Sequence, residues 1–542
     1  MKINKISVFL KKITIIKHVQ EGGENKMLVM NFILGLLPII WLVIALCGLK
    51  WPGYKAALGA LIIAAVEALT VFHFSAIDTA TSILEGFAFA FWPIVIVIIA
   101  AVFTYNLSLR TGSIDMIKKL LTSVSEDKRI LVLLIGWCFG GFMEGMAGFG
   151  TAVAIPASML WVLDFDPITA CLVCLIANAT PTPFGSIGIP TITLATNLGL
   201  ENNLISFATV CILSVLIILT PFIMVMILGK GMKSLKGIVP VIFISGISFL
   251  IPEMLVAYFV GAELACVAGS VVSLVCTILA SIKLTNADNI PDEYRLQVKK
   301  GSPLKVNDTL KALSPFILIF VVLLLTSNLV PPIHDSLSAI TTSVKISTYK
   351  NAGMTSFAWV NTPGVLIIIC AIIGGFIQKA KVSEMAAVFI ATLKQMAFTV
   401  LTMLFILGTA RVMQYSGMIG AVAELFSIFG PIYPFFAPVL GALGTFVTGS
   451  GTSSSALFGS VQMSTAASIG ANQYWMVAAN SLGVATGKMM APQSIAIGLV
   501  AVNEAGRDGE LLKRVMPYAV LFIVLSALIC FFGQYVWALF GI

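Results

Sequence analysis

The sequence has few charged residues: only 10% of its 542 residues are Asp, Glu, Lys or Arg, whereas 59% are hydrophobic. Soluble chains carry roughly 25% charged residues, so this composition leaves too little polar surface for a soluble globular protein. Long polar tracts are also missing and the 45 glycines show no period, which excludes disordered and collagen-like chains. The class that remains is a polytopic helical membrane protein.

Cysteine and histidine are also sparse, with nine and three residues. Cys171 and Cys174 form a CxxC pair, but no histidine or second pair is near them in the sequence, so we predict neither a metal site nor a cofactor. The GxxxxGK[ST] phosphate-binding pattern does not occur, and no histidine accompanies the serine-rich segments to activate a nucleophile. The sequence therefore predicts no enzyme. Its net charge of +8 indicates orientation in a membrane rather than a nucleic-acid partner.

Apolar runs of about 20 residues, enough to cross a lipid bilayer as a helix, recur along the chain. We expect them at 28–48, 54–74, 91–109, 204–229, 238–259, 262–283, 312–330, 361–379, 395–415 and 515–539. Two further apolar regions, 131–198 and 432–503, are broken by Gly, Pro, Ser and Thr. The pattern predicts an all-α polytopic membrane protein with about 12 crossings and two re-entrant hairpins. Nothing in it indicates an oligomeric state.

Basic residues are distributed unequally between alternate loops, which predicts the orientation. The loops that carry most of the Lys and Arg residues are 50–55, 110–130, 230–237, 283–311, 379–394 and 504–514. The intervening loops carry only Lys345 and Lys350. We therefore expect the basic loops in the cytoplasm, with Met27 and the C-terminus outside. Because residues 1–26 are lysine-rich and would then lie outside, we predict that they precede the true start, Met27.

The two broken regions resemble each other. Gly148 recurs as Gly449 and Asn178 recurs as Asn480 at nearly the same spacing. The loop beside the first copy is basic whereas its counterpart, 416–431, has no basic residue, so the copies are expected to have opposite orientations. The sequence thus predicts two inverted-topology repeats. Their expected bounds are 27–230 and 312–542, joined by two spans and a cytoplasmic loop at 231–311.

Each copy is expected to contain a re-entrant hairpin followed by an interrupted crossing. The predicted hairpin tips are 144–151 and 448–455, and the predicted breaks are 180–186 and 486–493. Irregular backbone at membrane depth persists only where it is buried in protein or lines a cavity. The two tips and two breaks are therefore predicted to converge on the substrate site.

The residues at these tips and breaks suit a small carboxylate. Helix N-termini present free N–H groups and partial positive charge, and serine and threonine hydroxyls can donate hydrogen bonds. Lys488 is the only lysine deep in an apolar segment, and intramembrane ionisable residues are functional candidates. The candidate substrate-binding residues are Lys488, Ser450, Thr452, Ser453, Ser454, Gln493, Ser494, Asn178, Asn480, Gly148 and Gly150. Glu144, at the first tip, is the candidate for proton coupling.

The charged residues also have structural interpretations, which are alternatives to these functional roles. Lys488 can snorkel or neutralise a buried acid, and Glu144 can cap the hairpin. Arg411 can serve as an anion gate or as an interfacial anchor.

Several strings are similar to those of the L-lactate permease family. They lie at 91–103, 141–150, 184–190, 448–458 and 487–497. The resemblance covers essentially 27–542 and implies import of L-lactate, and often D-lactate and glycolate, by proton symport across the bacterial inner membrane. It also implies that Glu144 and Lys488 occupy charged positions of the family. Gly451 and Ser455 stand where the family usually has Asp and Asn.

The sequence thus predicts a secondary transporter whose partners are a small carboxylate, a coupling proton and the lipid bilayer. One alternative is a Na⁺-coupled importer of another organic anion, with Asn178, Asn480 and unwound carbonyls holding the ion. A membrane sensor that does not transport is the alternative from another class, although the loops are short and no soluble signalling domain is evident.

Overall fold

A computed structural model of the chain describes residues 23–49, 51–122, 124–148, 150–285, 290–296, 306–327 and 329–540. Eleven of the described helices are long and apolar enough to cross a membrane, or twelve if one bent pair is counted as a single span. The predicted all-helical, multi-pass architecture is therefore confirmed. Residues 1–22, most of the predicted N-terminal extension, lie outside the described part of the chain.

The elements before the first polar insert at 284–311 fall into α-helices, π-helices and 3₁₀ turns. The α-helices are α2 (Gly23–Val43), α3 (Gly53–Thr70), α4 (Ala76–Phe89), α5 (Ile96–Arg110), α6 (Ser113–Thr122), α7 (Lys128–Leu131), α8 (Gly140–Met146), α9 (Thr151–Val162), α10 (Pro167–Ala177), α11 (Gly185–Leu198), α12 (Asn202–Leu228), α13 (Val239–Phe259) and α14 (Ala262–Leu284). The π-helices are η1 (Ile44–Gly48), η2 (Ala90–Val95) and η3 (Val132–Phe139), and the 3₁₀ turns are η4 (Thr182–Phe184) and η5 (Met232–Leu235).

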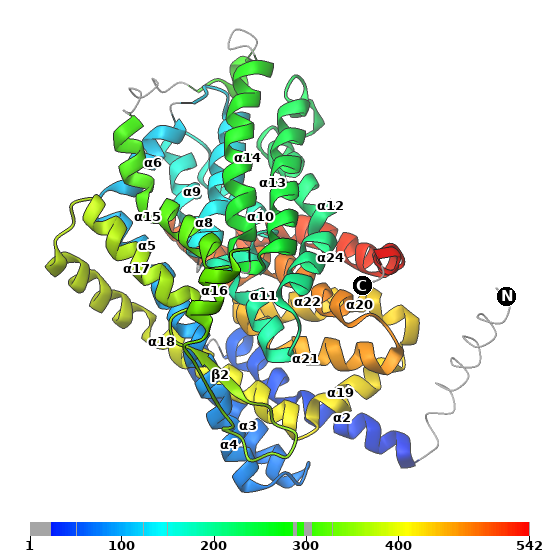
Figure 1. Ribbon diagram of the computed structural model, residues 1–542. Coiled ribbons are helices and arrows are strands. Elements are labelled where there is room, and N and C mark those ends of the chain that lie inside the picture. Colours follow the sequence, from blue (N-terminus) through cyan, green and yellow to red (C-terminus); the bar gives the residue numbers. More distant parts are fainter. Residues whose placement is uncertain are drawn as a thin grey trace.

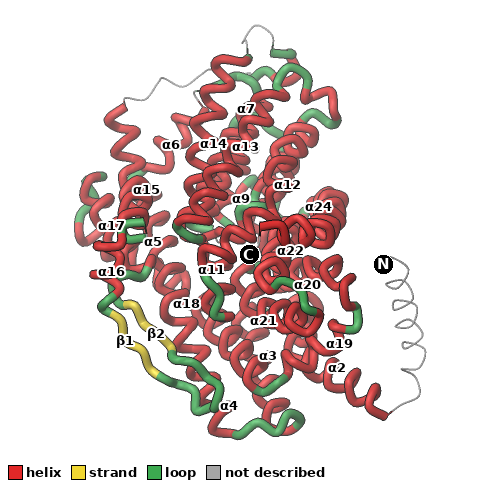
Figure 2. Tube along the Cα trace, turned by 45° about the vertical axis from the view of Figure 1, so that its right-hand side comes forward, coloured by secondary structure: helices red, strands yellow, loops and turns green. Residues whose placement is uncertain are grey.

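The remaining elements include one pair of short strands. The α-helices are α15 (Val306–Leu325), α16 (Pro331–Ser338), α17 (Pro363–Ile377), α18 (Val382–Tyr415), α19 (Met418–Ser427), α20 (Tyr433–Thr448), α21 (Gly451–Ile469), α22 (Gln473–Met490), α23 (Pro492–Ala501) and α24 (Asp508–Trp537). The strands β1 (Thr341–Val344) and β2 (Thr355–Ala358) pair antiparallel, and η7 (Asp292–Tyr294), η8 (Gly430–Ile432) and η9 (Ala538–Phe540) are 3₁₀ turns. This β-hairpin, which the sequence did not predict, lies in the connection between α16 and α17 (Figure 2).

The helices pack in two groups (Figure 1). In the first, α18 packs against α3 and α4, and α17 packs against α5 and α15. In the second, α22 packs against α20, α12 and α24, while α13 and α14 pair beside α8 and α11. Helix α21 contacts both groups, because it packs against α22 and α11 on one side and α18 on the other. The hairpins and broken helices therefore face the long helix α18.

The first predicted hairpin is present as α7, η3 and α8, followed by α9. Its two ends lie together, since Lys128 Nζ donates a hydrogen bond of 3.1 Å to the Asp164 carbonyl and lies 4.0 Å from the Asp164 carboxylate. The tip contains Gly148 and Gly150, both with positive φ, a conformation that glycine adopts without a Cβ penalty. The first arm runs from residue 128 to 146, which is long and apolar enough to cross a membrane. Phe149, inside the tip, lies outside the described residues.

The second predicted hairpin is α20 and α21, with its tip at Gly449 and Ser450. Gly449 ends α20 with a φ of 67°, and Ser450 caps α21 by accepting a hydrogen bond from the Ser453 N–H. The tip thus falls inside the predicted range of 448–455.

The first broken crossing has two halves, α10 and the segment formed by η4 and α11. The two halves are bent by 65° relative to each other. Ser186, Ile187 and Gly188 all have positive φ and form a left-handed turn inside the break. This break matches the predicted 180–186 and extends slightly beyond it.

The second broken crossing is formed by α22 and α23. Its non-helical segment is shorter than the predicted break at 486–493. Only Ala491 leaves the helical region, with φ −63° and ψ 126°. The cause is Pro492, because proline pushes the residue before it out of the α conformation. Lys488 therefore lies in the last turn of α22 and not in an unwound segment.

Candidate functional site

The hairpin tip and the broken helix touch each other within each half of the chain. In the first half, a Cβ added to Gly185 in the break would collide with the Glu144 carboxylate in the hairpin. In the second half, a Cβ added to Gly449 at the tip would collide with the Gln493 side chain after the break. Glycine at both positions therefore permits a close approach, and an added Cβ would force the Glu144 or Gln493 side chain to move.

The two halves also meet each other at the same place. Gly150, at the first tip, lies against Ile497 of α23, whose Cδ1 would be 2.7 Å from an added Cβ. Gly451, at the second tip, lies against Thr182 and Pro190 of the first break. The two hairpin tips and the two helix breaks therefore lie together in the structure, as predicted.

The four elements enclose a cavity of ≈ 580 Å³, within the range of about 300–1,000 Å³ that is typical of ligand sites. Four helices, α9, α11, α21 and α23, begin at this cavity, so their first backbone N–H groups lie around it. Among its described lining residues, Glu144 and Lys488 are the only ones with an acidic carboxyl or a basic amino group. The cavity therefore combines one cation, one acid and several helix N-termini.

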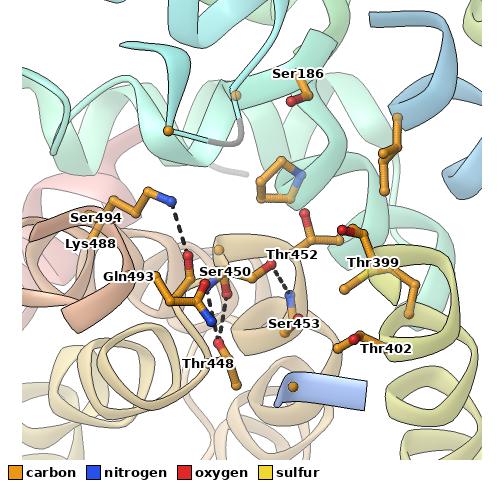
Figure 3. A pocket seen from close by; sticks show the side chains of 18 of the residues that line it. Ser186, Thr399, Thr402, Thr448, Ser450, Thr452, Ser453, Lys488, Gln493 and Ser494 are labelled. Atoms are coloured by element: carbon orange, nitrogen blue, oxygen red, sulfur yellow. Dashed lines mark hydrogen bonds between the residues drawn. The ribbon is translucent and has the colours of Figure 1, made fainter. Parts of the chain in front are cut away.

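Lys488 reaches the second hairpin tip from the end of α22. Its Nζ donates a hydrogen bond of 3.0 Å to the Gly449 carbonyl, and the residue is only 7% exposed (Figure 3). Since Gly449 ends α20, this bond satisfies a carbonyl that has no partner within the helix. An ammonium group has three donors, so Lys488 keeps donors for an anion in the cavity.

Glu144, in α8, lines the same cavity and is 3% exposed. In the described part of the chain its Oε2 is buried without a hydrogen-bond partner, and its charge interacts with that of Lys488 without an ion pair within 4 Å. Ser453 Oγ and Ser494 Oγ, also in the cavity wall, are likewise buried without a partner among described residues. Such unsatisfied groups indicate a site for a polar ligand.

The structure brings most of the predicted site residues together. The predicted residues that line the cavity are Glu144, Lys488, Ser450, Thr452, Ser453, Gln493, Ser494 and Gly150. The predicted residues outside the lining are Ser454, Asn178, Asn480 and Gly148.

These four residues outside the lining lie close behind it. Ser454 Oγ donates to the Gly441 carbonyl at 2.9 Å, which fixes the hairpin instead of facing the cavity. Gly148 lies against Ser186. The side-chain amides of Asn178 and Asn480 are buried, and that of Asn178 lies beside the Glu144 carboxyl group.

Sequence reasoning missed one whole wall of the cavity. This wall comes from the first helical group and contains Pro52, Gly53, Tyr54, Ile98, Met396, Phe398, Thr399, Thr402 and Met403. Thr399 and Thr402 face the cavity opposite Lys488 (Figure 3). The available signal was the i, i+3 spacing of these two threonines in an apolar helix.

Arg411 does not line the cavity. Its Nε lies 3.3 Å from Glu85 Oε1, and the Tyr415 hydroxyl donates to the same oxygen at 2.8 Å. Arg411 also donates to Gln414 Oε1 at 2.9 Å. Both charged side chains are largely buried, at 11% and 4% exposure, so the pair joins α18 to α4 inside the first helical group.

We expect the Arg411→Met substitution to destabilise the fold and to leave the substrate KM unchanged. Removing one partner of a buried ion pair costs about 3–5 kcal/mol because the other charge stays buried. Thermal unfolding in detergent measures the loss. The matched control is Arg507→Met, because Arg507 forms exposed pairs with Glu504 and Glu510 and little change is expected. A raised KM with unchanged stability would instead assign Arg411 to anion binding.

Comparison with known proteins gives close relatives over nearly the whole chain. The family model for L-lactate permease matches residues 31–537. An L-lactate permease of Streptococcus iniae is 41% identical over 82% of this chain and 93% of that protein. An L-lactate permease of Salmonella typhimurium is 33% identical over 92% and 95%, and the glycolate permease GlcA of Escherichia coli is 33% identical over 94% and 96%.

Two solved transporter structures show a weaker likeness. Neisseria gonorrhoeae MtrF, described as one of a class of antimetabolite efflux pumps, gives a TM-score of 0.44 at 12% identity over 84% of this chain and 83% of that one. The YdaH transporter of Alcanivorax borkumensis gives 0.44 at 14% identity over 85% and 88%.

Proposed function

Since the chain belongs to the L-lactate permease family, and is therefore a membrane transporter and not an enzyme, we propose that it imports L-lactate by proton symport. D-lactate and glycolate are proposed as further substrates, the latter because a glycolate permease is among the relatives. The observation that carries the proposal is the cavity in which Lys488, Glu144 and four helix N-termini meet.

Recognition of the carboxylate is proposed to centre on Lys488 and the start of α21. The Lys488 ammonium and the free N–H groups at Gly451 and Thr452 all line the cavity, and both kinds of group favour negative charge. Across the cavity, Thr399 can donate a hydrogen bond to the substrate's hydroxyl group. Thr402, whose hydroxyl donates to the Phe398 carbonyl at 2.8 Å, can accept one from it. The substrate would thus be held between the two helical groups.

Proton coupling is proposed to follow from the count of charges. When Glu144 is ionised, its charge already balances that of Lys488, so an entering carboxylate would place two anions against one cation. When Glu144 is protonated, the carboxylate alone balances Lys488. Each ligand therefore favours the binding of the other, so the coupling free energy between proton and anion is favourable.

The predicted orientation and repeats complete the proposal. The basic loops are placed in the cytoplasm, with Met27 and the C-terminus outside, in a bacterial inner membrane. Residues 27–230 and 312–542 are proposed to be the inverted repeats. This is supported by their shared order of a helical hairpin followed by a broken helix, at 128–198 and 430–501.

Reconstitution into liposomes tests the proposed function. We expect labelled L-lactate to accumulate under an imposed inward pH gradient without Na⁺, and excess unlabelled glycolate to compete. Accumulation that requires a Na⁺ gradient would support the Na⁺-coupled alternative. If neither gradient drives uptake of L-lactate or glycolate, the proposed substrate is wrong.

A further inference from the structure

A second cavity, of ≈ 380 Å³, lies further along the same helices that line the substrate cavity. Its polar wall consists of Gln414 of α18, Ser460 and Ser464 of α21, and Gln473 of α22. These amide and hydroxyl groups suit a small hydrophilic carboxylate and carry no charge that would trap it. Ser460 Oγ is buried without a partner in the described part of the chain, which also indicates a polar ligand or water there.

One face of α18 connects the two cavities. Thr399 and Met403 line the substrate cavity, and Gln414, about three turns beyond Met403, lines the second. Between them on the same face, at spacings of three and four residues, are Ile406 and Ala410, which are 2% and 3% exposed. This face is therefore polar at the cavities and apolar and buried between them.

Helix α21 repeats this arrangement, and α11 also runs between the two cavities. On α21, Ser453 lines the substrate cavity, Ala456 is 1% exposed, and Ser460 lines the second cavity. On α11, Leu194 is fully buried between Pro190 in the substrate cavity and Leu198 in the second.

The three helices run in the same direction from the substrate cavity to the second cavity. Gly459 brings α21 against α11, because an added Cβ would lie 2.5 Å from Leu194 Cδ2. The residues between the cavities, Ile406, Ala410, Ala456 and Leu194, are called the apolar partition here.

We propose that the second cavity is the mouth of the transport route on the membrane face opposite to that of the substrate cavity. The inference rests on the proposed function. An ionised carboxylate cannot pass the apolar partition while it is closed, because an unpaired charge is strongly disfavoured in an apolar environment. Passage requires α18 to separate from α21 at the partition. The two cavities are then the two alternately open ends of one route.

The positions of the two cavities agree with the proposed orientation. Pro52 and Tyr54, at the substrate cavity, lie in or next to the basic loop 50–55 that is proposed to be cytoplasmic. Gly417 and Gly420, at the second cavity, lie in the segment 416–431 that carries no basic residue. The second cavity is therefore assigned to the outer face.

Cysteine labelling of the full-length protein from each membrane face tests this inference. Thr402→Cys and Ser464→Cys place a thiol in the substrate cavity and the second cavity, and Ala410→Cys places one in the partition. With a membrane-impermeant thiol reagent, we expect Ser464→Cys to react from outside intact cells and Thr402→Cys to react in inside-out vesicles. We expect Ala410→Cys to react at least about tenfold more slowly from either face, because only molecules with an open partition expose it.

Labelling of the parent protein measures the reaction of the native cysteines and serves as the control. Thermal unfolding shows whether each variant is folded. If Ser464→Cys does not fold, Gln473→Cys probes the same cavity. Labelling of both cavities from one face, or of the second cavity from neither face, would overturn the inference. Because labelling needs no substrate, opposite-face labelling without L-lactate uptake would reject the substrate and keep the route. Same-face labelling with intact uptake would reject the route alone.

Discussion

The Lys488→Met substitution is expected to abolish measurable L-lactate uptake. Lys488 is the only cationic side chain among the described residues that line the substrate cavity, and its loss leaves the substrate carboxylate and Glu144 without a counter-charge. Removing one partner of a buried charge pair costs about 2–5 kcal/mol, which corresponds to roughly 30- to 4,000-fold in affinity. Equilibrium binding of labelled L-lactate to purified protein measures the change in Kd.

The control separates loss of binding from loss of structure. Lys513 is an exposed lysine in α24 that does not line the cavity, and Lys513→Met is expected to leave the Kd unchanged. Lys488→Met also removes the hydrogen bond to the Gly449 carbonyl, so some loss of thermal stability is expected with it. A Kd within about threefold of the parent, less than 1 kcal/mol, would show that the carboxylate is bound elsewhere.

The sequence predicted the wall of the site that lies on the hairpins and broken helices, because local chemistry specifies those features. Gly148 and Gly150 provide the positive φ values of a tip, and Pro492 ends α22 at Ala491. The break predicted at 486–493 is too wide, because Gly487 stays inside α22. A glycine inside a helix only weakens it, whereas proline blocks the conformation of the preceding residue.

The wall formed by Tyr54, Thr399 and Thr402 could not be predicted in this way. Its position depends on α3 packing against α18, two helices far apart in sequence, and no local pattern records that pairing. Repetition was also an incomplete guide. Asn178 and Asn480 recur between the two halves, yet both lie behind the cavity wall, because a shared fold repeats structural residues as well as those that bind ligands.

Glu144→Gln is expected to remove accumulation driven by a pH gradient while preserving exchange of L-lactate across the membrane. Glutamine resembles the protonated carboxyl group in shape and charge, so the variant should still bind the anion beside Lys488. Glutamine does not take up or release a proton during transport, so a pH gradient can no longer drive accumulation of the substrate. In the parent, each pH unit across the membrane supports about tenfold accumulation by one-to-one symport, since it is worth about 1.4 kcal/mol.

The pH dependence gives an independent measurement of the same role. In the parent, L-lactate affinity should fall as the pH rises, because ionised Glu144 then repels the anion. In Glu144→Gln the affinity should stay at the parent's low-pH value. Glu253→Gln is the matched control, since Glu253 in α13 is equally buried and lacks a hydrogen-bond partner among described residues, but does not line the cavity. If Glu144→Gln accumulates L-lactate under a pH gradient as the control does, the coupling proton is carried by another group, and Glu144 serves only to hold the first hairpin against Gly185.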